Sequence, residues 1–182
     1  MAIKLDGEFE IQRSLEEVYD FLTDPNKFAP LLPEFQSLAV QDVTHFAVKV
    51  NVGISYIKGA ADVKLELAQA DRPGRAQYKG QGSVAGGNVS FTAGFDLSAA
   101  GAGTRVAWQG EAQIFGRLAS VAGGLLEPLG KKNVQKLIDA LQAALNQSTN
   151  HVGTDAIALP AQQSLAANAE RAEDGSRSDT GS

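Results

Sequence analysis

The sequence of 182 residues contains no cysteine, one methionine, one tryptophan and two histidines. Without cysteine the chain forms no disulfide, offers no thiolate to a metal and has no cysteine nucleophile. No apolar run approaches the roughly 18 residues that a membrane-spanning helix needs. The first residues, MAIKLDGE, are interrupted by charges and do not resemble a secretory signal. We therefore expect a cytoplasmic protein.

Positive charge is also in short supply. Lysine and arginine number 16 against 21 aspartates and glutamates, which gives a net charge of −5. A protein that binds nucleic acid needs a basic face to meet the phosphates, so we expect no nucleic-acid partner. Glycine, in contrast, is abundant at 19 residues, which indicates turns, bulges or interior space.

The apolar periodicity of the chain ends near Gln147. Residues 148–182 contain no aromatic residue and are rich in Ala, Ser, Gly, Asp and Gln. Such a segment buries too little apolar surface to offset the entropy lost on ordering, about 1–2 kcal/mol per residue. The sequence predicts one domain over residues 1–147, followed by a disordered polar tail over 148–182.

Within the domain, alternation of apolar and polar residues predicts a half-buried first strand over residues 3–11. Ser14 and Glu17 form a capping-box pattern, which predicts the start of a short helix. Residues 28–33, bounded by prolines, predict a second short helix or turn. Further alternating segments, separated by turn sequences, predict six more strands. We place them at 35–43, 46–52, 62–67, 75–84, 90–97 and 105–114.

After residue 116 the apolar spacing changes to three and four, which predicts one long amphipathic helix over residues 118–145. Pro128 lies inside this segment and is expected to kink the helix or end its first part. A sheet with one apolar face and a helix with one apolar stripe must pack against each other. We therefore predict an α+β helix-grip fold, in which a curved antiparallel sheet wraps the C-terminal helix.

Five short motifs occur in this framework, and together they resemble a known family. They are FLTDP at 21–25, LLP at 31–33, VKVNVG at 48–53, YIKG at 56–59 and GRLA at 116–119. With them the chain resembles the START-like, or polyketide cyclase-like, superfamily over about residues 2–146. Within that superfamily it is most similar to the G-subunit family of carbon monoxide dehydrogenase.

The resemblance implies a non-catalytic accessory role and a hydrophobic cavity between sheet and helix. It implies a lipophilic ligand, such as the isoprenoid quinones menaquinone or ubiquinone, and no other cofactor. The implied partners are a molybdenum hydroxylase of the carbon monoxide dehydrogenase type and, transiently, the inner face of the cell membrane. The implied role is to serve or recruit that enzyme and to support its electron transfer.

We expect aromatic and aliphatic side chains on the inward phase of the strands to line this cavity, with a lid from the second short helix. The interior-phase residues Ala93, Gly110 and Ala112, among others, are small, which favours an open space over a filled core. A head group would meet Tyr56, Tyr78 or Trp108. The residues expected to contact the ligand are Phe28, Leu31, Leu32, Phe46, Val48, Tyr56, Tyr78, Phe91, Phe95, Trp108, Leu118, Val121 and Leu125.

The sequence offers no convincing catalytic or metal site. His45 and His151 are the only histidines, and neither has a second ligand at a metal-binding spacing. Two alternatives to a carrier stay open at this point. One is a cyclase or dehydratase that uses the same cavity, which would need an ionisable residue facing inward. The other is an interaction module in which the aromatic residues simply fill a core.

Overall fold

The computed structural model describes residues 1–54, 57–84 and 86–147, with the backbone alone at 121–123 and 147. Met1–Leu145 forms a compact unit. Its elements follow the order predicted from the sequence. They are β1 (Ala2–Ile11), α1 (Leu15–Thr23), α2 (Pro25–Phe28), a 3-10 turn η1 (Ala29–Leu31), β2 (Phe35–Val40), β3 (His45–Ile54), β4 (Ile57–Asp71), β5 (Arg75–Val84), β6 (Gly87–Ala100), β7 (Gly103–Gly116) and α3 (Arg117–Gln147).

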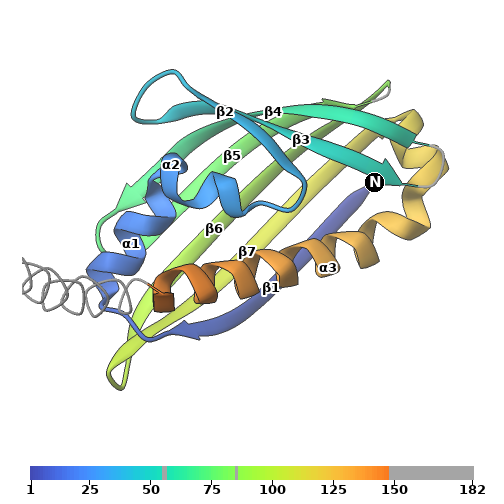
Figure 1. Ribbon diagram of the computed structural model, residues 1–182. Helices are drawn as coiled ribbons and strands as arrows, with labels where there is room; N and C mark the ends of the chain where they lie inside the picture. The colour runs from blue at the N-terminus through green and yellow to red at the C-terminus, as the bar shows by residue number, and fades with distance from the viewer. Residues whose placement is uncertain (55–56, 85, 148–182) are drawn as a thin grey trace, which may run out of the picture. The chain divides into compact units, whose positions relative to one another are not determined.

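The seven strands form one antiparallel sheet in the order β1-β7-β6-β5-β4-β3-β2. Figure 1 shows the sheet curving around the helices, with α3 along one face and α1 and α2 on the same face near one end. Each strand except β1 pairs with its successor in the chain, and β1 pairs with β7. This arrangement confirms the predicted α+β helix-grip fold.

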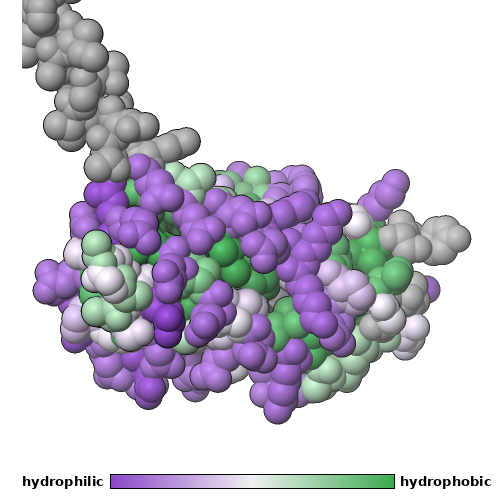
Figure 2. Space-filling model, turned by 90° about the horizontal axis from the view of Figure 1, so that it is seen from below, coloured by the Kyte–Doolittle hydropathy of each residue, from purple (hydrophilic) through white to green (hydrophobic). Residues whose placement is uncertain are grey.

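Viewed from below, the surface is mostly hydrophilic (Figure 2). Hydrophobic residues show between the hydrophilic ones in the middle of this face, and they gather again at the end where α3 begins. Among the described residues, no helix is both long and apolar enough to cross a bilayer.

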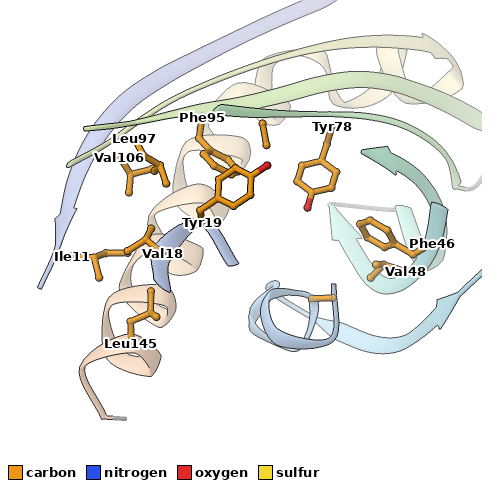
Figure 3. Close-up of a cluster of buried hydrophobic side chains, with 12 residues drawn as sticks. Ile11, Val18, Tyr19, Phe46, Val48, Tyr78, Phe95, Leu97, Val106 and Leu145 are labelled. Carbon is orange, nitrogen blue, oxygen red and sulfur yellow. The ribbon is translucent and has the colours of Figure 1, made fainter. Parts of the chain in front are cut away.

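The core consists of two clusters at opposite ends of the strands. The larger cluster lies beneath α1 and α2 and contains Tyr19, Phe46, Tyr78 and Phe95 (Figure 3). The smaller cluster lies where β3 and β7 end and α3 begins, with Ile54, Val84, Ile114 and Leu118 buried together. Packing of these bulky side chains at both ends fixes the sheet and leaves the middle of its inner face to be covered by α3.

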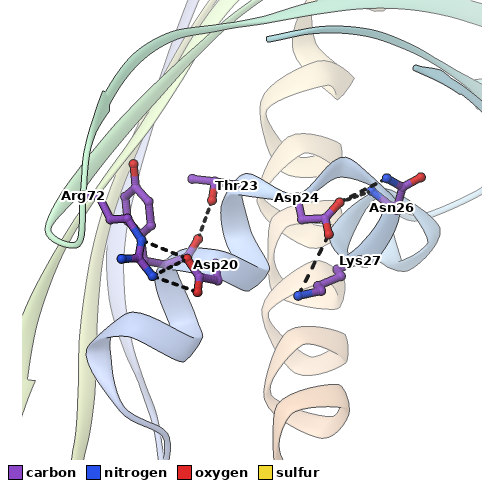
Figure 4. Close-up of polar contacts among 7 residues, drawn as sticks. Asp20, Thr23, Asp24, Asn26, Lys27 and Arg72 are labelled. Atoms are coloured by element: carbon purple, nitrogen blue, oxygen red, sulfur yellow. Dashed lines mark hydrogen bonds and ion pairs between the residues drawn. The ribbon is translucent and has the colours of Figure 1, made fainter. Parts of the chain in front are cut away.

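Helix α1 begins with the predicted capping box. The Ser14 hydroxyl accepts a hydrogen bond from the Glu17 backbone N–H at 3.3 Å, and the Glu17 carboxylate accepts one from the Ser14 N–H at 3.1 Å. At the other end of α1, Asp24 accepts a hydrogen bond from the Asn26 N–H at 3.0 Å and begins α2 (Figure 4). The second short helix therefore starts at Pro25, three residues before the predicted position, because Asp24 caps it there.

An ion pair ties α1 to the turn between β4 and β5. The guanidinium of Arg72 donates to both carboxylate oxygens of Asp20, with Nη2 at 3.0 Å from Oδ2 (Figure 4). This hydrogen bonding lowers the pKa of Asp20 below its ordinary value. The pair joins residues that are 52 positions apart and so holds the helical cap against the end of the sheet.

The predicted strands are confirmed, although several run further than their alternation indicated. β4 extends over 15 residues and carries a register shift between Leu67 and Gln69. Its inward phase includes Ala61, which is buried, whereas Ala60 is exposed, contrary to the expectation that Ala60 faces the interior. The long helix is also confirmed: α3 continues through Pro128, and Figure 1 shows it changing direction in its first half.

Candidate ligand-binding site

A cavity of about 350 Å³ lies between the sheet and α3. Its floor is formed by inward-facing residues of β1, β5, β6 and β7, and Leu22 of α1 also contributes to the wall. Its roof is formed by Val134, Leu137, Ile138 and Leu141, which share one face of α3 at spacings of three and four. The cavity therefore occupies the part of the inner face that lies between the two core clusters.

The register of the strands explains why this space is open. Ala93 on β6 lies opposite Gly110 on β7, and the next pair along the same face is Phe91 with Ala112. A side chain at position 110 would have room, since a Cβ there would meet nothing nearer than the Thr92 backbone oxygen at 3.7 Å. Three small residues on adjacent strands thus leave the centre of the floor low beneath α3.

Other small residues leave no such space, which corrects part of the sequence-based expectation. The tip of the Phe91 ring occupies the position where a Cβ at Gly80 would lie. A methyl group of Val63 would come 3.2 Å from a Cβ at Gly82. At these two positions, glycine accommodates a neighbouring side chain instead of widening the cavity.

Trp108 forms one wall of the cavity from β7. It pairs across the sheet with Gly7 on β1 and with Phe95 on β6. The indole lies close against Gly7, because a Cβ there would come 2.9 Å from its Cζ2 atom and 3.1 Å from Nε1. The Nε1 atom is sealed from solvent and has no hydrogen-bond partner among the described residues.

Tyr78 closes the cavity toward the helical cap. Its side chain is only 8% exposed, and its hydroxyl donates a hydrogen bond to the Leu22 carbonyl oxygen at 2.9 Å. Burial raises the pKa of this hydroxyl well above its ordinary value. The ring also packs against Phe28 and Phe46, with centroids 5.7 and 5.9 Å away. Tyr78 therefore joins the cavity wall to the core beneath α1 and α2.

The structure brings four of the expected ligand contacts to the cavity wall: Tyr78, Phe91, Phe95 and Trp108. It places the expected lid and its neighbours elsewhere. The Phe28 ring packs edge-on against Phe46 at 5.8 Å, so these aromatic residues contact each other in the core and not the cavity. Leu31 is half-buried in η1. Phe28, Leu32, Phe46 and Val48 all belong to the larger core cluster.

The first part of α3 is likewise not at the cavity. Leu118 is buried in the smaller core cluster, and the Leu125 side chain is 53% exposed. Tyr56 lies outside the described residues, and of Val121 the structure describes only the backbone. Wall residues that sequence reasoning did not select are Ile3, Leu5, Phe9, Leu22, Val106, Val134, Leu137, Ile138 and Leu141.

Two larger hollows, of about 620 and 780 Å³, lie on the outer face of the sheet. Their walls include the polar side chains of Lys64, Glu66 and Gln81 in one and of Asp6 and Gln109 in the other. A lipophilic molecule would desolvate these groups without pairing them, so the apolar cavity beneath α3 is the better ligand site.

His45 has an acidic neighbour that the sequence reading overlooked. Its Nδ1 lies 3.1 Å from a carboxylate oxygen of Asp42 in the turn between β2 and β3. Backbone hydrogen bonds from Thr44 above all, and from His45, lower the pKa of Asp42 to about 2. Both side chains are about half exposed. The described residues contain no group of three or more side chains placed to hold a metal ion, and His151 lies outside them.

The model of the CoxG family, the G component of carbon monoxide dehydrogenase, matches residues 7–146 of the chain. No curated protein sequence matches it. Among solved structures, a conserved protein from Geobacillus kaustophilus has 20% sequence identity and a TM-score of 0.73, and the match covers 80% of this chain and 97% of that one.

Two further solved structures place the fold in the START-like superfamily. A START superfamily protein from Mycobacterium smegmatis has 12% identity and a TM-score of 0.60, with 79% of this chain and 97% of that chain covered. The di-domain ARO/CYC protein BexL from the BE-7585A biosynthetic pathway has 13% identity and a TM-score of 0.54, with 79% and 48% covered. At these identities the likeness concerns the fold.

Proposed function

Because the chain belongs to the CoxG family of carbon monoxide dehydrogenase, we propose that it is a non-catalytic accessory protein that carries a lipophilic ligand. The observation that carries the proposal is the cavity of about 350 Å³ with an apolar roof on α3 and a floor lowered by Ala93, Gly110 and Ala112. Concave apolar spaces of about 300–1,000 Å³ are typical of small-molecule sites.

We propose an isoprenoid quinone, menaquinone or ubiquinone, as the ligand. Each buried methylene contributes about 0.8 kcal/mol, so one isoprene unit contributes roughly 3–4 kcal/mol. Two or three such units offset an association cost of about 4–15 kcal/mol. A bilayer solvates the same tail about equally well, so transfer between membrane and protein is close to balanced. Such a balance suits a shuttle, because tight capture would prevent delivery.

A catalytic role in the same cavity has less support. A cyclase or dehydratase needs a general acid or base within reach of its substrate. The hydroxyl of Tyr78 is held by the Leu22 carbonyl, and its raised pKa disfavours the ionised form. The indole of Trp108 does not titrate. The titratable group at the described inner wall is thus a poor proton donor or acceptor near neutral pH.

We propose a molybdenum hydroxylase of the carbon monoxide dehydrogenase type as the partner enzyme. The support for this partner is membership of the family, whose description names the dehydrogenase. Co-purification of the chain with such an enzyme, measured by size-exclusion chromatography with and without quinone, tests the partnership. Separate elution under both conditions would contradict it.

We also propose that the protein docks transiently on an anionic membrane through the end where α3 begins. Phe115, just before α3, is 54% exposed, and Leu125 within it is 53% exposed. Although the chain is acidic overall, α3 carries four basic residues against two acidic ones, Glu127 and Asp139. The basic residues are Arg117, Lys131, Lys132 and Lys136. Exposed apolar side chains together with cations favour an anionic lipid surface.

Vesicle flotation tests the docking. Phe115→Ser combined with Leu125→Ser should reduce binding to anionic vesicles several-fold, while Val43→Ser, at a loop position that is 89% exposed, should leave it unchanged. Equal flotation of all three proteins would contradict this surface.

Uptake from quinone-loaded liposomes tests the carrier function itself. The protein is incubated with the liposomes and separated from them, and its quinone is extracted and quantified. Quinone should accompany the natural sequence and be lost with Ala93→Leu, which fills the floor of the cavity. Ala107→Leu on the exposed outer phase of β7 is the matched control and should retain uptake. Absence of quinone from all proteins, with Ala93→Leu more stable than the natural sequence, would contradict the proposal.

A further inference from the structure

The indole nitrogen of Trp108 is an unpaired donor in the wall of the cavity. Nε1 is sealed from solvent and makes no hydrogen bond within the described part of the chain. The N–H of a buried tryptophan usually finds a partner, and an exception in a native structure requires an explanation. A ligand in the adjacent cavity can supply the missing acceptor.

The other polar groups around the cavity are already occupied or face away. The Tyr78 hydroxyl donates to the Leu22 carbonyl oxygen at 2.9 Å. Thr92 and Glu111 alternate with inward-facing neighbours and so belong to the outer face of the sheet. The Glu111 carboxylate lies there, 3.6 Å from the Lys4 ammonium. Trp108 therefore stands out among the described wall residues as the donor without a partner.

We infer that the cavity selects a lipophilic ligand with a carbonyl oxygen, which accepts a hydrogen bond from Trp108 Nε1. The inference rests on the proposed carrier function and specifies the chemical class of the ligand. Ketones, esters and quinones fit this class. A free carboxylate or an amine does not, because within the described residues the wall presents no charged side chain that would compensate an ion in the cavity.

The geometry around Trp108 provides the movement that this bond requires. Nε1 now lies near Gly7 on β1, where the absence of a Cβ gives the indole edge its place. Two residues further along the same face of β7, Gly110 leaves open space beside the ring. A turn of the indole away from Gly7 and toward the space above Gly110 brings the N–H into the cavity, where it meets the ligand oxygen.

Nuclear magnetic resonance tests this directly, because Trp108 is the only tryptophan and gives a single indole N–H resonance in the full-length chain. Two probes of similar shape are titrated: 2-methyl-1,4-naphthoquinone, which carries carbonyl oxygens, and 2-methylnaphthalene, which carries none. The quinone should shift the indole proton downfield and bind about 10-fold more tightly than the hydrocarbon, a difference of about 1.4 kcal/mol.

Trp108→Phe keeps an aromatic ring and removes the N–H. It should abolish the 10-fold preference by weakening the quinone alone, while the hydrocarbon binds as before. Tyr19→Phe, which removes a hydroxyl in the core cluster outside the cavity wall, is the matched control and should keep the preference.

The outcomes separate this inference from the carrier proposal. Equal affinity for both probes with an unmoved indole resonance would overturn the role of Trp108 and leave the carrier function standing. Failure of both probes to bind would contradict the carrier function itself. Should Trp108→Phe fail to fold, the indole shift and the affinity ratio in the natural sequence still decide the question.

Discussion

The indole of Trp108 lies against Gly7, its cross-strand neighbour, at a distance that leaves no room for a side chain on β1. A Cβ at position 7 would come 2.9 Å from Cζ2, which is closer than real Cβ contacts. The pair is directly opposite in the β1–β7 register. This contact keeps the largest side chain of the cavity wall at the edge of the space, so that the floor at Gly110 stays open.

Gly7→Ala should therefore push the indole toward the cavity. Overpacking of this kind costs about 1–3 kcal/mol, and the free energy of unfolding should fall by an amount in that range. Gly53→Ala in β3, where a Cβ would meet nothing within 4 Å, is the matched control and should change stability by less than about 0.5 kcal/mol. Chemical denaturation followed by tryptophan fluorescence measures both. Equal stability of the two variants would show that the indole moves aside freely.

Tyr78→Phe should weaken the junction between the cavity and the helical cap. The substitution leaves the Leu22 carbonyl without its side-chain donor, and loss of one such hydrogen bond costs about 1 kcal/mol. Tyr19→Phe is the control, since no hydrogen bond of the Tyr19 hydroxyl is among the contacts of the described structure. Thermal denaturation should show the larger decrease for Tyr78→Phe, and a larger decrease for Tyr19→Phe would contradict the assignment.

The Asp20–Arg72 ion pair predicts a pH dependence of stability. The native pKa of Asp20 is lowered by its hydrogen bonds with Arg72, so its contribution is present above the unfolded-state pKa of about 3.9 and is lost as the pH falls through the native value. Asp20→Asn should lower the melting temperature at pH 7, and the difference from the natural sequence should vanish at strongly acidic pH. Asp6→Asn on the outer face of β1 should show no such pattern. A difference that persists at acidic pH would exclude the ion pair as its source.

Hydrogen exchange should reveal a mobile cap above a stable core. The short segment at 26–34 has few helical hydrogen bonds of its own, whereas α3 is a continuous helix of 31 residues. Amides at 26–34 should exchange faster than those at 132–145, because short segments open locally at low cost. Equal protection of both segments would mean that the cap does not open separately and could not serve as a lid.

Much of the cavity floor was predictable from the sequence because strand alternation determines which side chains face inward. Phe91, Phe95 and Trp108 were selected on this basis, and the structure places them at the wall. Ile3 and Leu5 follow the same alternation in the first strand. They could have been found from this signal, once the pairing of β1 with β7 placed them beside Gly110 and Ala112.

The roof was not predictable in this way. The apolar spacing in α3 is similar along the helix, and so it indicates which face is buried but not which turn covers the cavity. The choice of Leu118 and Leu125 over Val134 and Leu137 failed because the first turns of α3 lie against the bulky end of the sheet. Tertiary packing decides where the helix crosses the floor.

Methyl resonances test the central claim most directly, because the cavity and the smaller core cluster contain separate sets of methyl groups. The full-length protein is titrated with 2-methyl-1,4-naphthoquinone while both sets are followed. The account predicts that methyls of Val106, Val134, Leu137, Ile138 and Leu141 shift together, while those of Ile54, Val84, Ile114 and Leu118 stay in place. Shifts confined to the second set, or none in either set, would contradict a ligand site between the sheet and α3.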